Sequence, residues 1–124
     1  VDLLAQPFDL IVLPGGAVGC EHLVAHQPLL QMLADQARAG GFYAAIAQAP
    51  ALVLQPAGLL KQRRMTCLPA VSDRLSGCNF IDQPVVVDGN CITAQGSGAA
   101  LAFALTLVEQ LGGKARRNAV AAQL

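Results

Sequence analysis

The stretch FYAAIAQAP, Phe42 to Pro50, decides the fold of this 124-residue chain. Apolar residues run as far as Ile46, and Ala47-Gln48-Ala49-Pro50 then interrupts them. The run predicts a strand buried on both faces, as in a parallel sheet, and the interruption predicts a sharp turn into a helix. In many α/β enzymes such a turn carries the nucleophile. Here it carries Ala47, which can neither lose a proton nor attack a substrate.

The segments on both sides of this stretch repeat the pattern of strand and helix. FDLIVL, Phe8 to Leu13, predicts a second buried strand that ends at Pro14-Gly15-Gly16. Leucines and alanines at helical spacings predict a helix over 21–39, which Gly40-Gly41 ends. A short helix is predicted over 50–54, before Pro56-Ala57-Gly58.

The second half of the chain adds a hairpin and two helices. The pattern predicts a short strand at 64–67, a weak helix at 70–75, strands at 85–87 and 92–94, and helices at 99–111 and 114–123. The turn Asp88-Gly89-Asn90 is a strong hairpin signal. This order predicts one α/β domain over 1–124 with a mainly parallel sheet. Only two or three parallel strands are visible, and a missing first βαβ unit, before Val1, would account for that.

Composition excludes several classes of protein. Hydrophobic residues make up 54% of the chain, charged residues 13%, and the net charge is zero, so a core-rich domain is expected. The chain contains no apolar run long enough for a membrane span. The basic clusters 61–64 and 116–117 are too short to predict a nucleic-acid partner, and we expect them to be solvated faces.

Cysteine spacing indicates free thiols. The four cysteines form no CxxC pair and fit no zinc template, which predicts no metal and a reducing, cytoplasmic compartment; they are Cys20, Cys67, Cys78 and Cys91. His22 and His26 stand four residues apart, a spacing that can bind a metal on one helix face. No local acidic residue completes that set, so we expect both to be surface side chains.

Three turns follow predicted strand ends, at 14–16, 47–48 and 96–98. In an open parallel sheet, ligands bind outside the carboxyl ends of the strands, so we expect these turns to line one pocket. Gly15 and Gly16 could present backbone N–H groups as an oxyanion hole. The alternative is an ordinary tight turn that needs glycine for its backbone angles.

Four motifs together carry a resemblance to a known family. They are FDLIVLPGG (8–16), AAIAQAP (44–50), MTCLP (65–69) and ITAQGSGAALAFAL (92–105). With these motifs the chain resembles the DJ-1/ThiJ/PfpI family, in its DJ-1-like and YajL-like branch, within the class I glutamine amidotransferase-like superfamily. The resemblance implies a flavodoxin-like three-layer sandwich lacking its first βαβ unit, a homodimer, and no cofactor. Members are described as glyoxalase III-like or protein-deglycase-like enzymes, redox-stress chaperones or, in another branch, proteases.

The resemblance also implies roles for particular residues. Ala47 falls at the position of the nucleophilic cysteine, and Gly16, preceded by Gly15, falls at the oxyanion hole. The implied pocket positions are Gln48, Leu68, Gln95, Gly96 and Ser97. The family's acidic partner of the cysteine would lie upstream of Val1. With thiol and acid both lacking, we expect an impaired enzyme if Ala47 is the natural residue, and an active parent protein if Ala47 was introduced in place of a cysteine. The relatives act on small reactive carbonyls or glycated substrates.

Two further hypotheses remain open at this point. Cys20 or Cys67 could supply a substitute thiol, although Cys67 is expected to point into packing if Leu68 points into the pocket. Cys78 is predicted in a loop, and Cys91 in the hairpin or core. Alternatively, the chain is a non-catalytic binding or chaperone-like domain, or an incomplete fragment whose open sheet edge favours dimerisation.

Overall fold

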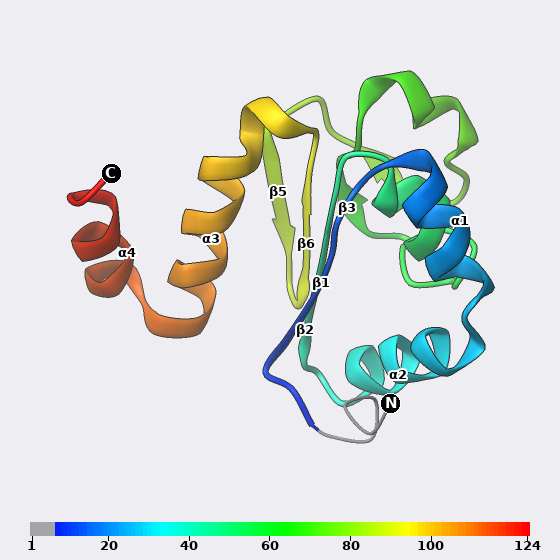
Figure 1. Cartoon of the computed structure of the whole chain (residues 1–124), viewed down its shortest axis with the longest axis horizontal. Coiled ribbons are helices and arrows are strands. Elements are labelled where there is room, and N and C mark those ends of the chain that lie inside the picture. Colours follow the sequence, from blue (N-terminus) through cyan, green and yellow to red (C-terminus); the bar gives the residue numbers. More distant parts are fainter. Residues whose placement is uncertain (1–6) are drawn as a thin grey trace.

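The computed structural model describes residues 7–124, and its centre is a four-stranded sheet (Figure 1). The strands are ordered β1 (Leu10–Leu13), β2 (Phe42–Ile46), β6 (Cys91–Ala94) and β5 (Val85–Asp88). The first three are parallel, and β5 pairs antiparallel with β6. The predicted α/β fold with a mainly parallel sheet is therefore confirmed.

Helices cover the sheet on both sides and make three layers (Figure 1). One face carries α1 (Ala17–Ala25), α2 (Gln27–Arg38) and the π-helical segment Pro50–Leu54. The other face carries α3 (Ala100–Gly112), against which α4 (Lys114–Ala121) packs. None of the helices in residues 7–124 combines the length and apolar composition needed to cross a bilayer.

Alternation along β2 sends its side chains into two separate cores, because successive strand residues point to opposite faces. Tyr43 and Ala45 lie in the core beneath α1 and α2. Ala44 lies in the other core, where Phe103 of α3 packs against the sheet. All three β2 residues are buried, as the continuous apolar run predicts for a strand covered on both sides.

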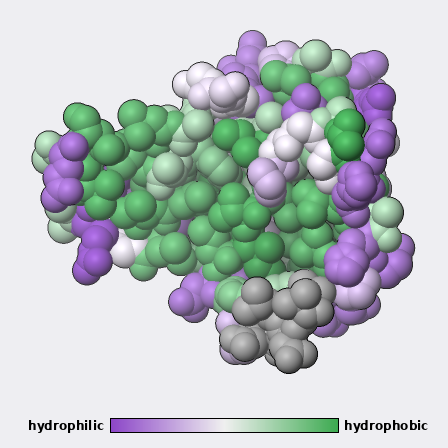
Figure 2. Space-filling view, in the orientation of Figure 1, coloured by the Kyte–Doolittle hydropathy of each residue, from purple (hydrophilic) through white to green (hydrophobic). Residues whose placement is uncertain are grey.

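The face that carries α3 is less completely covered than the other. Figure 2 shows a broad apolar area that runs over the sheet and α3. Large apolar side chains are also exposed on β1 and α3: Val12 of β1 has 42% of its surface accessible, and Leu101 of α3 has 58%. A continuous apolar area differs from the single apolar side chains that are common on protein surfaces, and it favours contact with another apolar surface.

The single helix predicted over 21–39 is wrong, because the structure has two helices there. His26 takes an extended conformation (φ −91°, ψ 92°) between α1 and α2. Pro28 is the cause: within one continuous helix its ring would clash with the carbonyl four residues earlier, and it has no N–H to donate. At the second position of a new helix, proline is tolerated.

Several predicted boundaries also shift. The first strand starts at Leu10 rather than Phe8, the strand predicted at 64–67 is β3 (Arg64–Met65), and the weak helix is the 3₁₀ turn Pro69–Arg74. β3 lies outside the main sheet and pairs in parallel with β4 (Asn79–Phe80), a strand that the sequence did not predict. The helices predicted over 99–111 and 114–123 correspond to α3 and α4.

The predicted hairpin is present, and Arg63 holds its tip. Gly89, at φ +59°, and Asn90 join β5 to β6. The Arg63 guanidinium donates to the Asp88 carbonyl at 2.8 Å and to Asn90 Oδ1 at 2.6 Å. Asn90 Nδ2 in turn donates to the Gly41 carbonyl at 3.0 Å, just before β2. The hairpin tip is thus tied to segments that lie far away in the sequence.

Candidate functional site

The turn after β2 has a strained backbone that other strands hold in place. Ala47 has φ +61°, a left-handed backbone conformation that residues other than glycine rarely adopt. Its N–H donates to the Ala94 carbonyl of β6 at 3.0 Å, and its carbonyl accepts the Leu68 N–H at 2.9 Å. Strain of this kind persists only where the surroundings determine it, and it clusters at functional sites.

A helical segment begins directly after Ala47. The Leu52 N–H donates to the Gln48 carbonyl at 2.9 Å, and the Gln55 N–H donates to the Pro50 carbonyl at 2.9 Å, which closes a wider turn of the π-helical kind. The residue at position 47 therefore stands between the end of a buried strand and the start of a helix. This is the strand–turn–helix shape predicted from FYAAIAQAP, and we call residues 46–49 the elbow.

The turn after β1 approaches the elbow closely. A β-carbon at position 15 would lie 2.7 Å from Ala47 Cβ and 3.1 Å from the Ile46 carbonyl oxygen, so only glycine fits there without a shift. Gly16, at φ +99°, precedes α1. The predicted neighbours Gly15, Gly16 and Ala47 are thus brought together.

Gln48 reaches back across this contact. Its side-chain Oε1 accepts the backbone N–H of Gly16 at 3.0 Å. Gly16 is the position that the sequence predicted as an oxyanion-hole donor, and in this structure a side-chain carbonyl oxygen is already bound to it. Only an oxygen acceptor suits that N–H, which fixes the orientation of the Gln48 amide.

Several of the candidate residues line two separate hollows. One hollow, of about 310 Å³, is lined by Gln48 together with Ala17, Cys20, Glu21, Val24, Leu52, Val71 and Arg74. The other, of about 400 Å³, is lined by Leu68, Gln95, Gly96 and Ser97 together with Pro84, Gly98 and Ala99. The Ala47 backbone lies between them, bonded to residue 68 and to the end of β6.

The second hollow has a polar partner that the sequence did not reveal. Gln95 Nε2 donates to Asp82 Oδ1 at 2.7 Å, and the Gln95 N–H donates to the Pro84 carbonyl at 3.0 Å. Asp82 lies in a loop and carries no sequence pattern that would mark it. Its bond to Gln95 fixes the amide that the resemblance placed in the pocket.

A pair of buried threonines lies behind the elbow and was also missed. Thr93 of β6 is paired with Ala45 of β2, and its Oγ1 accepts the Thr66 N–H at 2.9 Å. Both threonines are fully buried, and the Thr66 hydroxyl finds no hydrogen-bond partner among residues 7–124. Thr93 thus joins the strand next to the elbow to the segment that leads to Leu68.

The two proposed substitute thiols are buried and held as thiols. Cys20 is fully buried, lies 4.0 Å from the Pro14 carbonyl oxygen, and lines the same hollow as Gln48. Cys67 lies in the main core, while its neighbour Leu68 lines the other hollow, and both follow the end of β3 rather than lying in a strand. Burial raises the pKa of Cys20, and raises the pKa of Cys67 to about 11.

The other two cysteines show the same electrostatic effect. Burial raises the pKa of Cys91, at the start of β6, to about 11. Burial also raises the pKa of Cys78, which lies in a loop as predicted, with a smaller opposing effect from a backbone hydrogen bond of Ser76. A protonated thiol is a poor nucleophile, so burial works against reactivity at each of these four positions.

The histidines do not share a helix face. His22 lies in α1 and His26 lies at the break before α2, and both are exposed, as expected for surface side chains. Within residues 7–124, no three His, Cys, Asp or Glu side chains gather as metal ligands.

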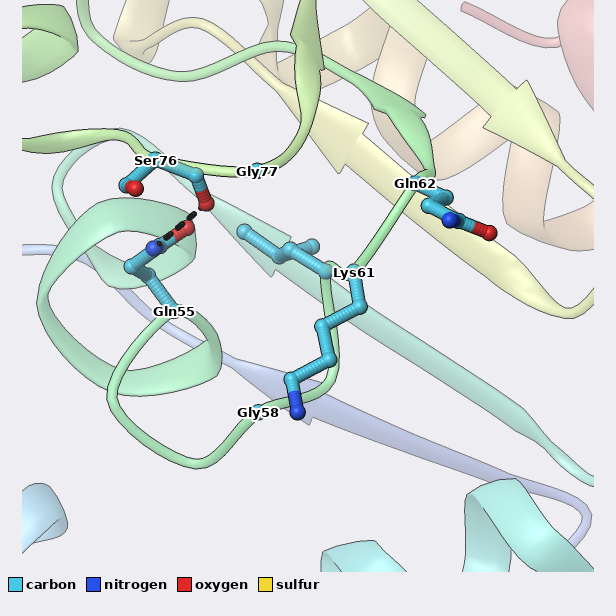
Figure 3. A pocket seen from close by; sticks show the side chains of 7 residues that line it. Gln55, Gly58, Lys61, Gln62, Ser76 and Gly77 are labelled. Atoms are coloured by element: carbon cyan, nitrogen blue, oxygen red, sulfur yellow. Dashed lines mark hydrogen bonds between the residues drawn. The ribbon is translucent and has the colours of Figure 1, made fainter.

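A larger hollow, of about 640 Å³, lies away from the elbow (Figure 3). It follows the end of the π-helical segment, where Gln55 Nε2 donates to the Ser76 carbonyl at 2.8 Å. Lys61 is its sole ionisable lining residue, and it contains none of the residues predicted for the site. Size alone therefore does not make it the candidate.

The three layers, the parallel strands and the elbow at their carboxyl ends define a flavodoxin-like α/β protein. The chain matches the model of the DJ-1/PfpI family over residues 1–110. It also superimposes on the crystal structure of Drosophila melanogaster DJ-1beta with a TM-score of 0.94 at 34% identity, covering 98% of this chain and 66% of that one.

Two curated relatives extend the comparison. Over 113 residues the chain is 43% identical to Protein DJ-1 homolog A of Arabidopsis thaliana, covering 91% of this chain and 29% of that relative. Over 121 residues it is 34% identical to glutathione-independent glyoxalase DJR-1.2 of Caenorhabditis elegans, covering 96% of this chain and 63% of that relative. The chain therefore belongs to the DJ-1/PfpI family, and it spans less than two-thirds of the length of both relatives.

Proposed function

We propose that this protein descends from a glyoxalase-type enzyme of the DJ-1/PfpI family and is catalytically impaired because Ala47 replaces the elbow nucleophile. The observation that carries the proposal is the elbow itself. Its backbone keeps the left-handed φ of +61° that presents a side chain between strand and helix, yet the side chain presented is a methyl group. Loss of a nucleophile removes covalent chemistry even where the surrounding site persists.

The other thiols support impairment rather than substitution. Cys20 lines the hollow next to the elbow but is buried, and its pKa is raised. Cys67 lies in the core with a pKa of about 11, where fewer than roughly one thiol in a thousand is ionised at pH 7. Neither replaces a thiol at position 47.

The substrate class follows from the relatives and from the size of the site. A relative is named a glutathione-independent glyoxalase, so small reactive carbonyls such as methylglyoxal, or glycated groups derived from them, are the proposed ligands. The hollow beside Gln48, about 310 Å³, lies at the lower end of the range for small-molecule sites. The reducing compartment favoured by four free thiols makes the cytoplasm the proposed location.

The test uses the full-length protein, with the residues upstream of Val1, and compares methylglyoxal consumption by the parent, Ala47→Cys and, as a control of similar size, Ala47→Ser. We expect turnover from Ala47→Cys alone, because only a thiolate at the elbow can attack the carbonyl readily at pH 7. Equal turnover by the parent and Ala47→Cys would show that another group performs the chemistry. No turnover from any variant would contradict the glyoxalase lineage.

A second candidate is a non-catalytic binding or chaperone-like protein that forms a homodimer. The broad apolar area over the sheet and α3 favours this candidate (Figure 2), as does the exposure of Leu101 on α3, 58% of whose surface is accessible. Leu101→Lys would then weaken self-association on a sizing column and reduce protection of a heat-denatured client protein, while Leu13→Val in the covered core would change neither. Unchanged association and protection by Leu101→Lys would count against it.

A further inference from the structure

We propose that Gln48 is an internal ligand: its side-chain oxygen occupies the Gly16 amide, and an incoming carbonyl or carboxylate oxygen must displace it to bind at the elbow. The inference rests on the proposed function for the identity of the ligand, but not for the contact itself. It makes Gln48 a positioning residue that sets how readily the site accepts an oxygen.

The geometry is that of an occupied anion-binding donor. Gln48 Oε1 lies 3.0 Å from the Gly16 nitrogen, a normal hydrogen-bond distance. The same oxygen would lie 3.2 Å from a β-carbon placed on Gly15, so it sits directly against the glycine turn. A backbone N–H next to a nucleophile position serves acyl chemistry by binding an oxygen that gains negative charge. Here the protein supplies a neutral amide oxygen in that role.

The contact is poised for exchange rather than locked. The bond is solvent-exposed and joins residues 32 positions apart, and Gln48 is only half-buried. A hydrogen bond of this kind contributes modestly in water, so displacing it costs a ligand about tenfold in affinity. Gly15 and Ala47 hold the turn itself in place, and the donor remains oriented when Gln48 leaves.

The lining of the hollow beside Gln48 indicates which kind of ligand could bind there. Gln48 lines it, with Leu52 and Val71 giving apolar contact and Glu21 and Arg74 contributing both signs of charge. A small ligand that combines an oxygen acceptor with a short apolar or hydroxylated body fits this mixture. Because Glu21 and Arg74 carry opposite charges, the lining as a whole does not favour a carboxylate over a neutral carbonyl.

The contact is tested by NMR on the ¹⁵N-labelled protein, with sodium acetate as the oxygen probe and chloride at equal ionic strength as control. Gln48→Met keeps the length of the side chain and removes the acceptor; Gln48→Glu keeps an acceptor oxygen. We expect the Gly16 amide signal to move in Gln48→Met and to respond to acetate at about tenfold lower concentration than in the parent. In Gln48→Glu we expect acetate to have even less effect than in the parent.

A catalytic comparison adds a second readout in the Ala47→Cys background. We expect Gln48→Met to raise kcat/KM for methylglyoxal about tenfold, and Gln48→Glu to leave it at or below the Ala47→Cys value. A merely structural role for Gln48 would instead lower kcat/KM in both double variants.

The two readouts separate the two ideas. If the Gly16 signal is unchanged in Gln48→Met, or acetate shifts it equally in the parent, the internal-ligand proposal is wrong whatever the activity. If the Gly16 signal behaves as expected but no variant with a thiol at position 47 consumes methylglyoxal, the glyoxalase lineage is wrong and the internal ligand stands.

Discussion

The elbow has the position of a nucleophile but no thiol, whereas the four cysteines have thiols in buried positions. Ala47 has the backbone conformation of a presented side chain, held by bonds to β6 and to Leu68, but it has no reactive atom. Cys67 and Cys91 have reactive atoms, but burial raises their pKa values to about 11. The comparison indicates that a thiol in this protein would be reactive only at a suitable position, because a cysteine buried in the core behaves as a small apolar side chain.

The largest expected effect comes from moving a thiol from one region to the other. In Ala47→Cys we expect iodoacetamide to alkylate position 47 about 100-fold faster at pH 7 than Cys67 or Cys91, since an ordinary thiol pKa of 9.0 lies about 2 units below 11. Mass spectrometry of peptides after timed labelling measures each site separately.

The pH dependence sharpens this comparison. Labelling of Cys67 should rise about tenfold for each pH unit between 7 and 10, because only the thiolate reacts, whereas labelling of position 47 in Ala47→Cys should level off above about pH 9. Similar labelling rates and similar pH profiles at position 47 and at Cys67 would contradict the prediction that the elbow and the core differ in thiol reactivity.

A second prediction concerns how tightly the elbow is held. Gly15→Ala would place a β-carbon 2.7 Å from Ala47 Cβ, which cannot move aside like the end of a long side chain. We expect a loss of about 2 kcal/mol in the free energy of unfolding, as for overpacked interiors. Gly98→Ala is the control, because a β-carbon there meets nothing within 4 Å and the residue lies in a short 3₁₀ turn rather than inside an α-helix, where alanine would itself add stability. Urea denaturation compares them, and equal stability of the two variants would mean that the elbow yields easily.

The smallest expected effect lies in the threonine pair behind the elbow. Thr93→Val removes the acceptor of the buried Thr66 N–H and should cost about 1–2 kcal/mol of stability. Thr66→Val removes a hydroxyl that has no partner within the described residues and should be neutral or slightly stabilising. Thermal unfolding measures the stability of both variants. A greater loss of stability in Thr66→Val than in Thr93→Val would contradict this interpretation.

The sequence predicted those parts of the fold that depend on local patterns. The apolar run over β2 and the Asp88-Gly89 turn were sufficient, because burial on both faces and a two-residue hairpin leave distinct signals. The helix break was missed although Pro28 was visible, because the apolar spacing continues past it. β4 was missed because two residues carry no periodicity, and its pairing with β3 depends on tertiary contacts.

The candidate site was predictable in its backbone and not in its side chains. Motifs placed the glycine turn and the elbow side by side, since parallel strands end at one edge of the sheet. The bond between Gln48 and Gly16 spans 32 positions, and that between Gln95 and Asp82 spans 13. No local rule predicts such partners, because they depend on which loops the folded chain brings together.

The tie at the hairpin tip has a consequence for the order of folding. Asn90 bonds to Gly41, 49 positions away, and Arg63 bonds to Asn90 across 27 positions. Loop closure over such distances must precede the contacts that reward it, so we expect this tip to form late in folding. It ties the amino ends of β2 and β6, at the opposite end of these strands from the elbow, so it fixes how the two strands are paired without contacting the elbow.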